Sequence, residues 1–274
     1  MTEVFQVNQL VAGYSQVRIL NELTVSIPAG KVTTIIGPNG CGKSTLLKTL
    51  GRILKKDSGD IFLQQQNMNT MSTREIAQKL AILSQSPSGP GQLKVFELIA
   101  YGRYPHRKNL GKLTEQDKEK IAWAMDITNT SAFAEREISA LSGGQRQRVW
   151  LAMALAQETD ILLLDEPTTY LDMAHQLEVL EIVEELNKNL GCTIVMVLHD
   201  LNHAARYSHE LIAIKDGQIQ CCGTPNDIMT NDMLKKVFNI DAQILYDEHN
   251  IPVCFSYKLI KEKAEKMKKE KVLV

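Results

Sequence analysis

The chain of 274 residues lacks the features of several protein classes. It has 5 cysteines, an odd number, and two of them, Cys221 and Cys222, are adjacent. In a chain of this length, such a cysteine pattern is not that of a small secreted protein built on a disulfide framework. Its longest apolar runs, such as 161–164, fall far short of the roughly 20 residues that span a bilayer, and no basic segment precedes an apolar stretch in MTEVFQVNQL. We therefore expect a protein of a reducing compartment that neither spans a membrane nor carries a standard export signal.

Net charge is also nearly absent, at -1 from 31 Lys and Arg against 32 Asp and Glu. This value is an average, because the segment 258–271 holds 7 Lys against 3 Glu and leaves the rest acidic. The balance excludes the broad basic surface of many nucleic-acid-binding proteins. The tail from Leu259, with Ile260, Ala264 and Met267 on one helical face, is predicted to be either a solvated helix or a contact to anionic lipid.

Hydrophobic residues make up 44% of the chain, which is enough for a globular core, and their spacing indicates an α/β fold. Alternation at 5–7 and 23–27 predicts half-buried antiparallel strands, and Asp216-Gly217 predicts a hairpin turn. Four short apolar or β-branched runs predict strands covered on both faces, as in a parallel sheet: 32–36, 81–83, 161–164 and 193–198.

Helical patterns separate these strands. One contains Leu46, Leu47, Leu50, Ile53 and Leu54, and another runs from Leu177 to Leu190 and ends at Gly191. The segment 86–140 differs from its surroundings and is predicted to be a helical insertion, with one helix capped by Thr114 and Asp117.

A phosphate-binding pattern lies between a predicted strand and a predicted helix, in the loop Gly37-Pro-Asn-Gly-Cys-Gly-Lys43-Ser44. Glycines allow backbone N–H groups to point at phosphate oxygens, Lys43 can reach the β- and γ-phosphates, and Ser44 can bind magnesium. The alternative is a Gly-rich turn without a ligand. The same loop contains Cys41, and its position near a helix N-terminus and Lys43 predicts a lowered thiol pKa.

Polar residues follow the other buried strands. Asp165 and Glu166 come at the carboxyl end of 161–164, where ligands of open α/β sheets bind, so we expect Asp165 to hold magnesium and Glu166 to activate water. Gln85 and His199 also follow sheet strands and are expected near the same crevice. His199 and His203 have the spacing of a zinc pair, but no third ligand is apparent.

A second Gly-containing loop, Leu141-Ser-Gly-Gly-Gln145, precedes a predicted helix at 146–156. One nucleotide needs only one phosphate loop. The second loop is therefore either an ordinary helix cap or part of a nucleotide site on another copy of the molecule.

Taken in order along the chain, these segments resemble the ATP-binding cassette family. Tyr14 resembles the aromatic residue that stacks on adenine, Leu141–Gln145 the signature motif with Ser142, Gly143, Gly144 and Gln145, and Leu171-Asp172 the D-loop. Gln85 resembles the Q-loop residue, Asp165 and Glu166 the Walker B carboxylates, and His199 the switch histidine. The Walker A loop is matched by Gly37, Pro38, Asn39, Gly40, Cys41, Gly42, Lys43, Ser44 and Thr45.

The resemblance implies a fold and an activity. The fold is a P-loop NTPase with an ABC-type antiparallel β subdomain and a helical insertion at about 86–140, inside one ATPase domain at 1–255. An accessory part at about 225–258 and a Lys-rich tail at 259–274 follow. Glu166, His199 and Gln85 are expected to serve ATP hydrolysis, with Mg²⁺ on Ser44, Gln85 and Asp165. Ser142 and Gly144 would act on ATP bound by a second copy of the chain.

Three segments, 97–105, 157–172 and 196–202, are similar to the ATPase subunits of iron-siderophore importers. Such a subunit works at the cytoplasmic face of the cell membrane with permease subunits, and indirectly with an extracytoplasmic binding protein. Arg103, Tyr104 and His106 are the expected permease contacts. Haem or cobalamin import is the alternative within the family, and a non-transport ATPase acting on nucleic acid is the alternative outside it, although no nucleic-acid partner is expected.

Overall fold

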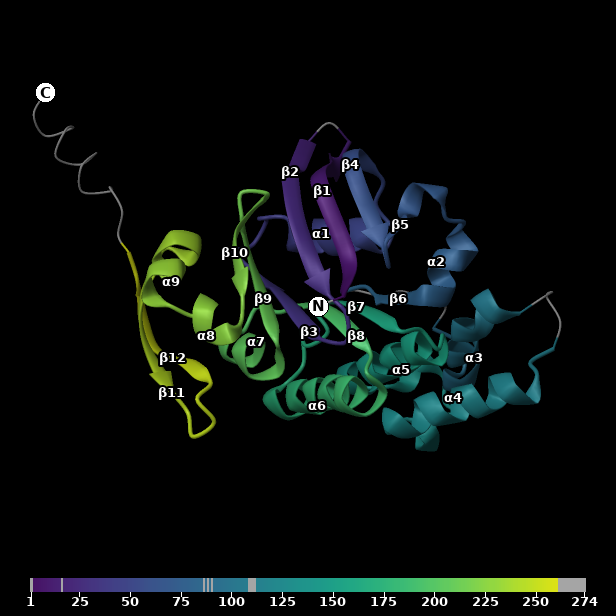
Figure 1. Cartoon of the computed structure of the whole chain (residues 1–274). Helices are drawn as coiled ribbons and strands as arrows, with labels where there is room; N and C mark the ends of the chain where they lie inside the picture. Colours follow the sequence, from purple (N-terminus) through teal and green to yellow (C-terminus); the bar gives the residue numbers. More distant parts are fainter. Residues whose placement is uncertain are drawn as a thin grey trace, which may run out of the picture.

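The centre of the fold is a mostly parallel sheet with the strand order β10-β9-β3-β8-β7-β6 (Figure 1). The computed structural model describes residues 2–15, 17–85, 87, 89, 91–107 and 112–260. Strands β3 (Val32–Ile36), β6 (Leu80–Leu83), β7 (Ile161–Asp165), β8 (Thr193–Val197) and β9 (Glu210–Lys215) are parallel to one another. Strand β10 (Gln218–Gly223) returns antiparallel to β9 through the predicted turn at Asp216-Gly217. The four buried strands expected from the sequence are thus confirmed.

Both faces of this sheet are covered, which explains why its parallel strands are buried and mostly apolar or β-branched. Along β7, Leu163 packs into one hydrophobic cluster, whereas Leu162 and Leu164 pack into the other. Successive side chains of a strand point to opposite faces, so each face needs its own apolar residues.

One face packs on helix α1 (Lys43–Leu50) and, beyond it, on an antiparallel sheet with the order β2-β1-β4-β5 (Figure 1). The strands of this second sheet are β1 (Glu3–Tyr14), β2 (Val17–Pro28), β4 (Lys56–Leu63) and β5 (Gln66–Asn67). The expected continuation of α1 to Leu54 is wrong. The helix ends at Leu50, because Gly51 caps it and the N–H groups of Ile53 and Leu54 both turn back to the Lys48 carbonyl.

Helices cover the other face. The described residues between β6 and β7 form α3 (Val95–Ala100), α4 (Glu115–Ile127) and α5 (Gly143–Ala156), with the 3₁₀ turns η2 (Tyr101–His106), η3 (Ser131–Phe133) and η4 (Ile138–Ala140). Thr114 and Asp117 form the predicted capping box of α4. Helix α6 (Met173–Leu190) ends at Gly191, whose φ of 65° lies in the left-handed region that favours glycine.

The remaining elements flank the two sheets. The turn η1 (Met68–Thr70) and helix α2 (Thr73–Lys79) precede β6, and α7 (Leu201–Tyr207), α8 (Pro225–Ile228) and α9 (Asn231–Phe238) follow β8. The last described elements are the antiparallel strands β11 (Ile240–Tyr246) and β12 (Pro252–Leu259). Leu259 pairs with Ile240 in this ladder, so it ends a strand and does not begin the predicted tail helix. From residue 261 on, that tail lies outside the described residues.

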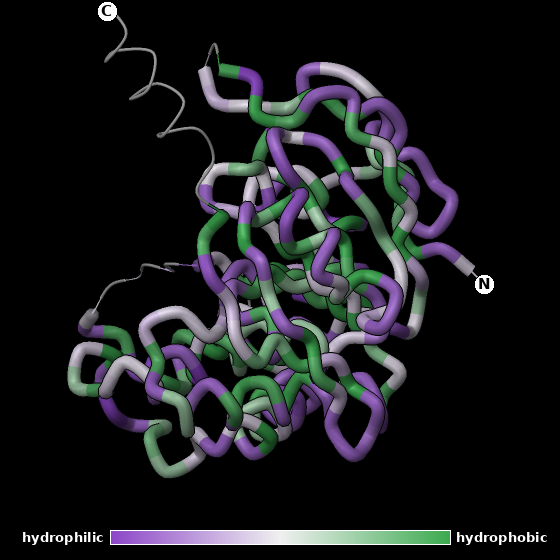
Figure 2. Tube along the Cα trace, turned by 90° about the vertical axis from the view of Figure 1, so that its left-hand side faces the viewer, coloured by the Kyte–Doolittle hydropathy of each residue, from purple (hydrophilic) through white to green (hydrophobic). Residues whose placement is uncertain are grey.

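Hydrophilic and hydrophobic stretches are interspersed along the described chain, as the repeated colour changes in Figure 2 show. No helix among the described residues is long and apolar enough to cross a membrane.

The expected exposure of Arg103 is wrong. Its side chain is only 3% exposed, its Nε lies 2.9 Å from Asp117 Oδ1, and its Nη1 donates to the Ala156 carbonyl at 2.8 Å. Arg103 therefore ties η2 to the start of α4 and the end of α5. His106 is half-buried, with Nε2 2.7 Å from the Gln157 carbonyl, and of the three expected contacts only Tyr104 is largely exposed, at 63%.

This buried ion pair predicts a measurable loss of stability in Asp117→Asn. Burial would raise the pKa of Asp117, but hydrogen bonds from Thr114 and Arg103 outweigh it and lower the pKa from 3.8 to about 2. The stabilisation is therefore present above pH 3.8 and is lost as the pH falls toward 2. It amounts to about 2 kcal/mol. We expect chemical denaturation at neutral pH to show a loss of about that size in Asp117→Asn.

The matched control is Glu115→Gln on the same helix, where Glu115 forms an exposed pair with Lys118. Its free energy of unfolding should stay within about 0.5 kcal/mol of the parent. Equal losses in the two variants would contradict a special role for the Arg103–Asp117 pair.

Candidate active site

A cavity of about 420 Å³ lies at the carboxyl ends of the parallel strands, where the phosphate loop, Gln85, Glu166 and His199 meet. These groups come from distant parts of the chain, and the sheet brings them together because parallel strands end at one edge. The lining residues are Tyr14, Ile19, Asn39, Gly40, Gly42, Lys43, Ser44, Thr45, Gln85, Glu166 and His199.

The phosphate loop is tied to the β9–β10 turn and carries a positive charge. Gly40 and Gly42 have φ values of 76° and 109°, which favour glycine, and the Gly217 N–H of the β9–β10 turn donates to the Cys41 carbonyl at 3.0 Å. Lys43 is buried and donates to the carbonyls of Gly37 at 2.9 Å and Pro38 at 3.0 Å. Together with the N-terminus of α1, the ammonium group makes this loop suited to an anion.

Beside the loop lies a carboxylate that is buried and only partly satisfied. Asp165 has no exposed surface, and its Oδ1 accepts a hydrogen bond of 2.6 Å from Ser44 Oγ. Its Oδ2 lies 3.7 Å from Lys48 Nζ and has no hydrogen-bond partner among the described residues. Burial raises the pKa of Asp165, although the contacts with Ser44 and Lys48 oppose the rise. An oxygen-binding cation such as Mg²⁺ fits this donor set, because it would satisfy the remaining oxygen.

Glu166 is the centre of a hydrogen-bonded group at the cavity wall. Its Oε2 accepts from Gln85 Nε2 at 2.5 Å and from Thr169 Oγ1 at 3.0 Å, and its Oε1 lies 2.7 Å from His199 Nε2. Its φ of 53° is unusual for a residue with a side chain, and such strain is concentrated at functional sites. The sequence predicts that Gln85, Glu166 and His199 lie at one crevice, and the structure confirms that placement.

Three residues of the candidate site were not expected from the sequence. Thr169 orients Glu166 from the turn after Pro167, Lys48 lies near Asp165 one helical turn beyond Ser44, and Ile19 adds an apolar wall. A Thr three residues after the carboxylate could have indicated the first of these. The positions of Lys48 and Ile19 at the site depend on how α1 and β2 pack.

The zinc alternative finds no support in the described residues, which contain no group of three possible ligands. His199 instead contacts Glu166. His203 lies in the first turn of α7. Its backbone N–H donates at 2.8 Å to the side chain of Asp200, which caps this helix.

The second glycine loop does not line the cavity. Ser142 caps α5, and its hydroxyl accepts from the Gln145 N–H at 3.3 Å while Gln145 Oε1 accepts from the Ser142 N–H. Asp172 caps α6 and lies 2.7 Å from His175 Nδ1. The His175 ring covers Gly144 so closely that a Cβ at 144 would lie 2.7 Å from its Cδ2. Within one chain, therefore, this region is a capped helix start beside the D-loop.

The expectation of an activated Cys41 thiol is wrong. Cys41 is 5% exposed, and burial raises the pKa of its thiol even though Lys43 opposes the rise. The loop places the sulfur underneath its glycines, where loss of hydration outweighs the nearby positive charge.

Comparison with known families gives a match over residues 20–169 to the model described as ABC transporter. The chain is 55% identical over 258 residues to the iron(3+)-hydroxamate import ATP-binding protein FhuC of Bacillus subtilis, a match that covers 94% of this chain and 96% of that protein.

Solved structures agree with this match. An inward-facing putative metal-chelate type ABC transporter superposes with a TM-score of 0.79 at 27% identity, over 94% of this chain and 97% of that one. The dimeric post-hydrolysis state of the ATP-binding cassette MJ0796, bound to ADP and Pi, gives a TM-score of 0.71 at 27% identity, over 80% and 98% of the two chains.

The corrected environment of Cys41 leads to a labelling prediction. Cys222 is exposed, so we expect a small alkylating reagent to modify it at least about tenfold faster than Cys41, whose thiol is buried and protonated. Mass spectrometry of peptides from a labelling time course measures both rates in the same sample. Labelling of Cys41 as fast as Cys222 would restore the original expectation.

Proposed function

Because this chain belongs to the ABC transporter family, we propose that it is the ATP-hydrolysing subunit of an importer for iron-siderophore complexes. The hydrogen-bonded Glu166 facing a phosphate loop carries the ATPase part of this proposal. The 55% identity to an iron(3+)-hydroxamate import protein over nearly the full length supports the cargo class.

Different residues of the chain would bind ATP and catalyse its hydrolysis. The loop from Gly37 to Thr45 would enclose the β- and γ-phosphates with backbone N–H groups, and Lys43 would exchange its loop carbonyls for phosphate oxygens. Tyr14, at the end of β1 and 46% exposed, would stack on the adenine. Glu166 would orient the attacking water and take its proton, while Gln85 and His199 hold the carboxylate toward the γ-phosphate.

Ser44, Gln85 and Asp165 are the proposed Mg²⁺ ligands. Gln85 donates its amide N–H to Glu166 and so keeps its amide oxygen for a cation, and Asp165 has one oxygen without a hydrogen bond among the described residues. When bound, Mg²⁺ would neutralise negative charge on the phosphates.

The signature loop is the part of the chain that would act on a second copy. Ser142, Gly143, Gly144 and Gln145, with Asp172 of the D-loop, lie outside the cavity of their own chain, so we propose that they complete the ATP site of the partner in a head-to-tail dimer. The dimeric structure of a cassette bound to ADP and Pi supports the formation of a dimer.

The membrane partners follow from the importer role. We propose one ATPase domain at 1–255, with the helical insertion at about 86–140 transmitting its motion to permease subunits at the cytoplasmic face of the membrane. An accessory part lies at about 225–258. Tyr104, exposed beside the buried Arg103, is the proposed contact, and an extracytoplasmic binding protein would act through the permease.

Substitution Glu166→Gln tests the catalytic role. We expect ATP binding and ATP-dependent dimerisation to persist, while the turnover number falls by about a hundredfold or more because the amide cannot accept a proton. Phosphate release and nucleotide binding are measured side by side, with the exposed Glu248→Gln as a charge-matched control. Unchanged hydrolysis in Glu166→Gln would exclude this residue as the base.

Mixing two inactive variants tests the shared site. Lys43→Ala disables the loop of one chain and Ser142→Arg the signature of the other, so a mixed dimer retains one intact site made from the two wild-type halves. We expect the mixture to recover up to about a quarter of the parental ATPase activity, from statistical pairing of the chains. If both sites were built within single chains, no activity would return although both variants fold.

A further inference from the structure

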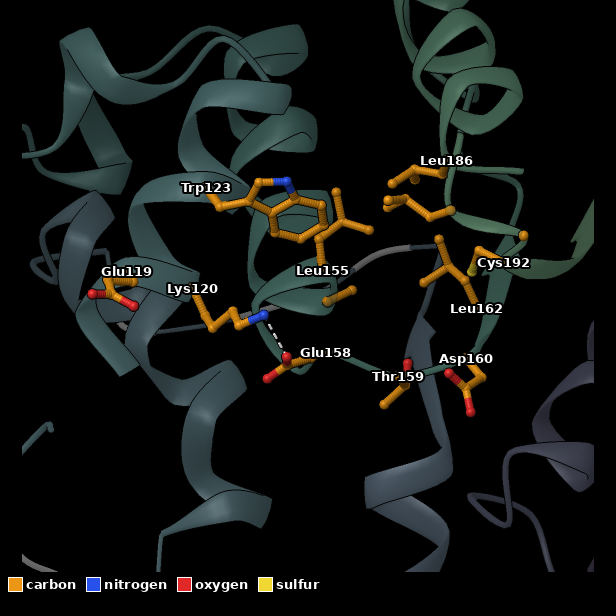
Figure 3. Close-up of a pocket in the computed structure, with 13 residues that line it drawn as sticks. Glu119, Lys120, Trp123, Leu155, Glu158, Thr159, Asp160, Leu162, Leu186 and Cys192 are labelled. Carbon is orange, nitrogen blue, oxygen red and sulfur yellow. Dashed lines mark ion pairs between the residues drawn. The ribbon is translucent and has the colours of Figure 1, made fainter. Parts of the chain in front are cut away.

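A second cavity, of about 500 Å³, lies away from the nucleotide site, between α4, the C-terminal ends of α5 and α6, and the start of β7 (Figure 3). None of the residues assigned above to ATP or Mg²⁺ lines it. Its volume falls within the range of about 300 to 1,000 Å³ that is usual for small-molecule sites.

One wall of this cavity is apolar. Figure 3 shows Trp123 of α4 facing the leucine side chains of α5, β7 and α6 across the opening. Cys192 belongs to the same wall, and burial raises the pKa of its thiol to about 12, so the sulfur is an uncharged surface here. Such a wall suits a compact hydrocarbon or aromatic body.

The rim of the cavity is acidic. Glu158 is neutralised, because its Oε1 lies 2.5 Å from Lys120 Nζ and its Oε2 lies 3.1 Å from Arg103 Nη1. Asp160 and Glu119 form no ion pair with any described residue. Helix α6, 18 residues long, ends at Leu190 beside the cavity and adds the negative end of its dipole. The uncompensated charge of the site is therefore negative.

We propose that this cavity binds a small organic cation, a protonated amine carrying an apolar body. The ammonium group lies at Asp160, and the body lies on Trp123 and the leucines. An anion of the same size would meet Asp160, Glu119 and the α6 C-terminus with like charge, so the site discriminates by charge as well as by shape.

The elements that form the cavity also carry the nucleotide site at their other ends. Asp160 and Asp165 are separated by the length of β7, roughly 15 Å, and α6 extends about 27 Å from the D-loop to the cavity. Ligand binding here is consequently separate from ATP binding and does not depend on the proposed transport function.

The test compares 4-phenylbutylamine with 4-phenylbutyrate, which share a ring and a chain but carry opposite charges. Trp150→Phe leaves Trp123 as the single tryptophan reporter. This change loses no hydrogen bond within the described residues, since Trp150 Nε1 has no partner there. We expect the amine to give a saturable fluorescence change with a Kd of about a millimolar. The carboxylate should bind at least about tenfold more weakly.

Two variants locate the site. In the Trp150→Phe background, Asp160→Asn should weaken amine binding about tenfold by removing the charged partner, whereas Asp232→Asn, which changes the same charge on distant α9, should leave it unchanged. Leu190→Arg, at a side chain 57% exposed, should abolish amine binding by placing a cation at the rim. Absence of a saturable signal from either probe, equal affinity for both, or equal effects of the two Asp→Asn variants would overturn the proposal.

Discussion

At the carboxyl edge of the central sheet the protein buries two charged groups that it satisfies only in part, and the candidate site depends on both of them. Lys43 is buried and turned onto the carbonyls of its own loop, while Asp165 is buried with one oxygen that no described residue hydrogen-bonds. Burial of incompletely paired charges is costly, so such an arrangement is stable only where strong local constraints maintain it. Here the constraint is the parallel sheet, whose strands end at one edge and fix the positions of both groups. The phosphate and magnesium chemistry proposed for the chain would compensate both charges at once.

Much of this arrangement could be predicted from the sequence, because it rests on short-range patterns. The four buried strands, the hairpin at Asp216-Gly217, the cap at Thr114 and the end of α6 at Gly191 each depend on a few adjacent residues. The same holds for the convergence of Gln85, Glu166 and His199, since each lies within two residues of the end of a buried strand. Parallel strands end at one edge of a sheet, and this rule alone predicts that the three side chains lie close together.

The wrong expectations concern burial by distant segments, which adjacent residues do not encode. Cys41 was given a reactive thiol because of its neighbours in the loop, but packing beneath the glycines removed water and raised its pKa. Arg103 was expected at the surface as a permease contact, yet Asp117 and the Ala156 carbonyl, which come from α4 and α5, enclose it. Leu259 was assigned to a tail helix, and its pairing with Ile240 across the β11–β12 ladder made it part of a strand.

The contact between His175 and Gly144 limits which substitutions the signature loop can accept, independently of any nucleotide. The imidazole occupies the space that a side chain at 144 would need, and Asp172 holds the ring in that position through Nδ1. Positions 144 and 175 therefore form a single steric unit, and a larger residue at 144 requires either that the imidazole moves away or that a smaller residue stands at 175. In a library of variants, or among related chains, these two positions are expected to change together rather than independently.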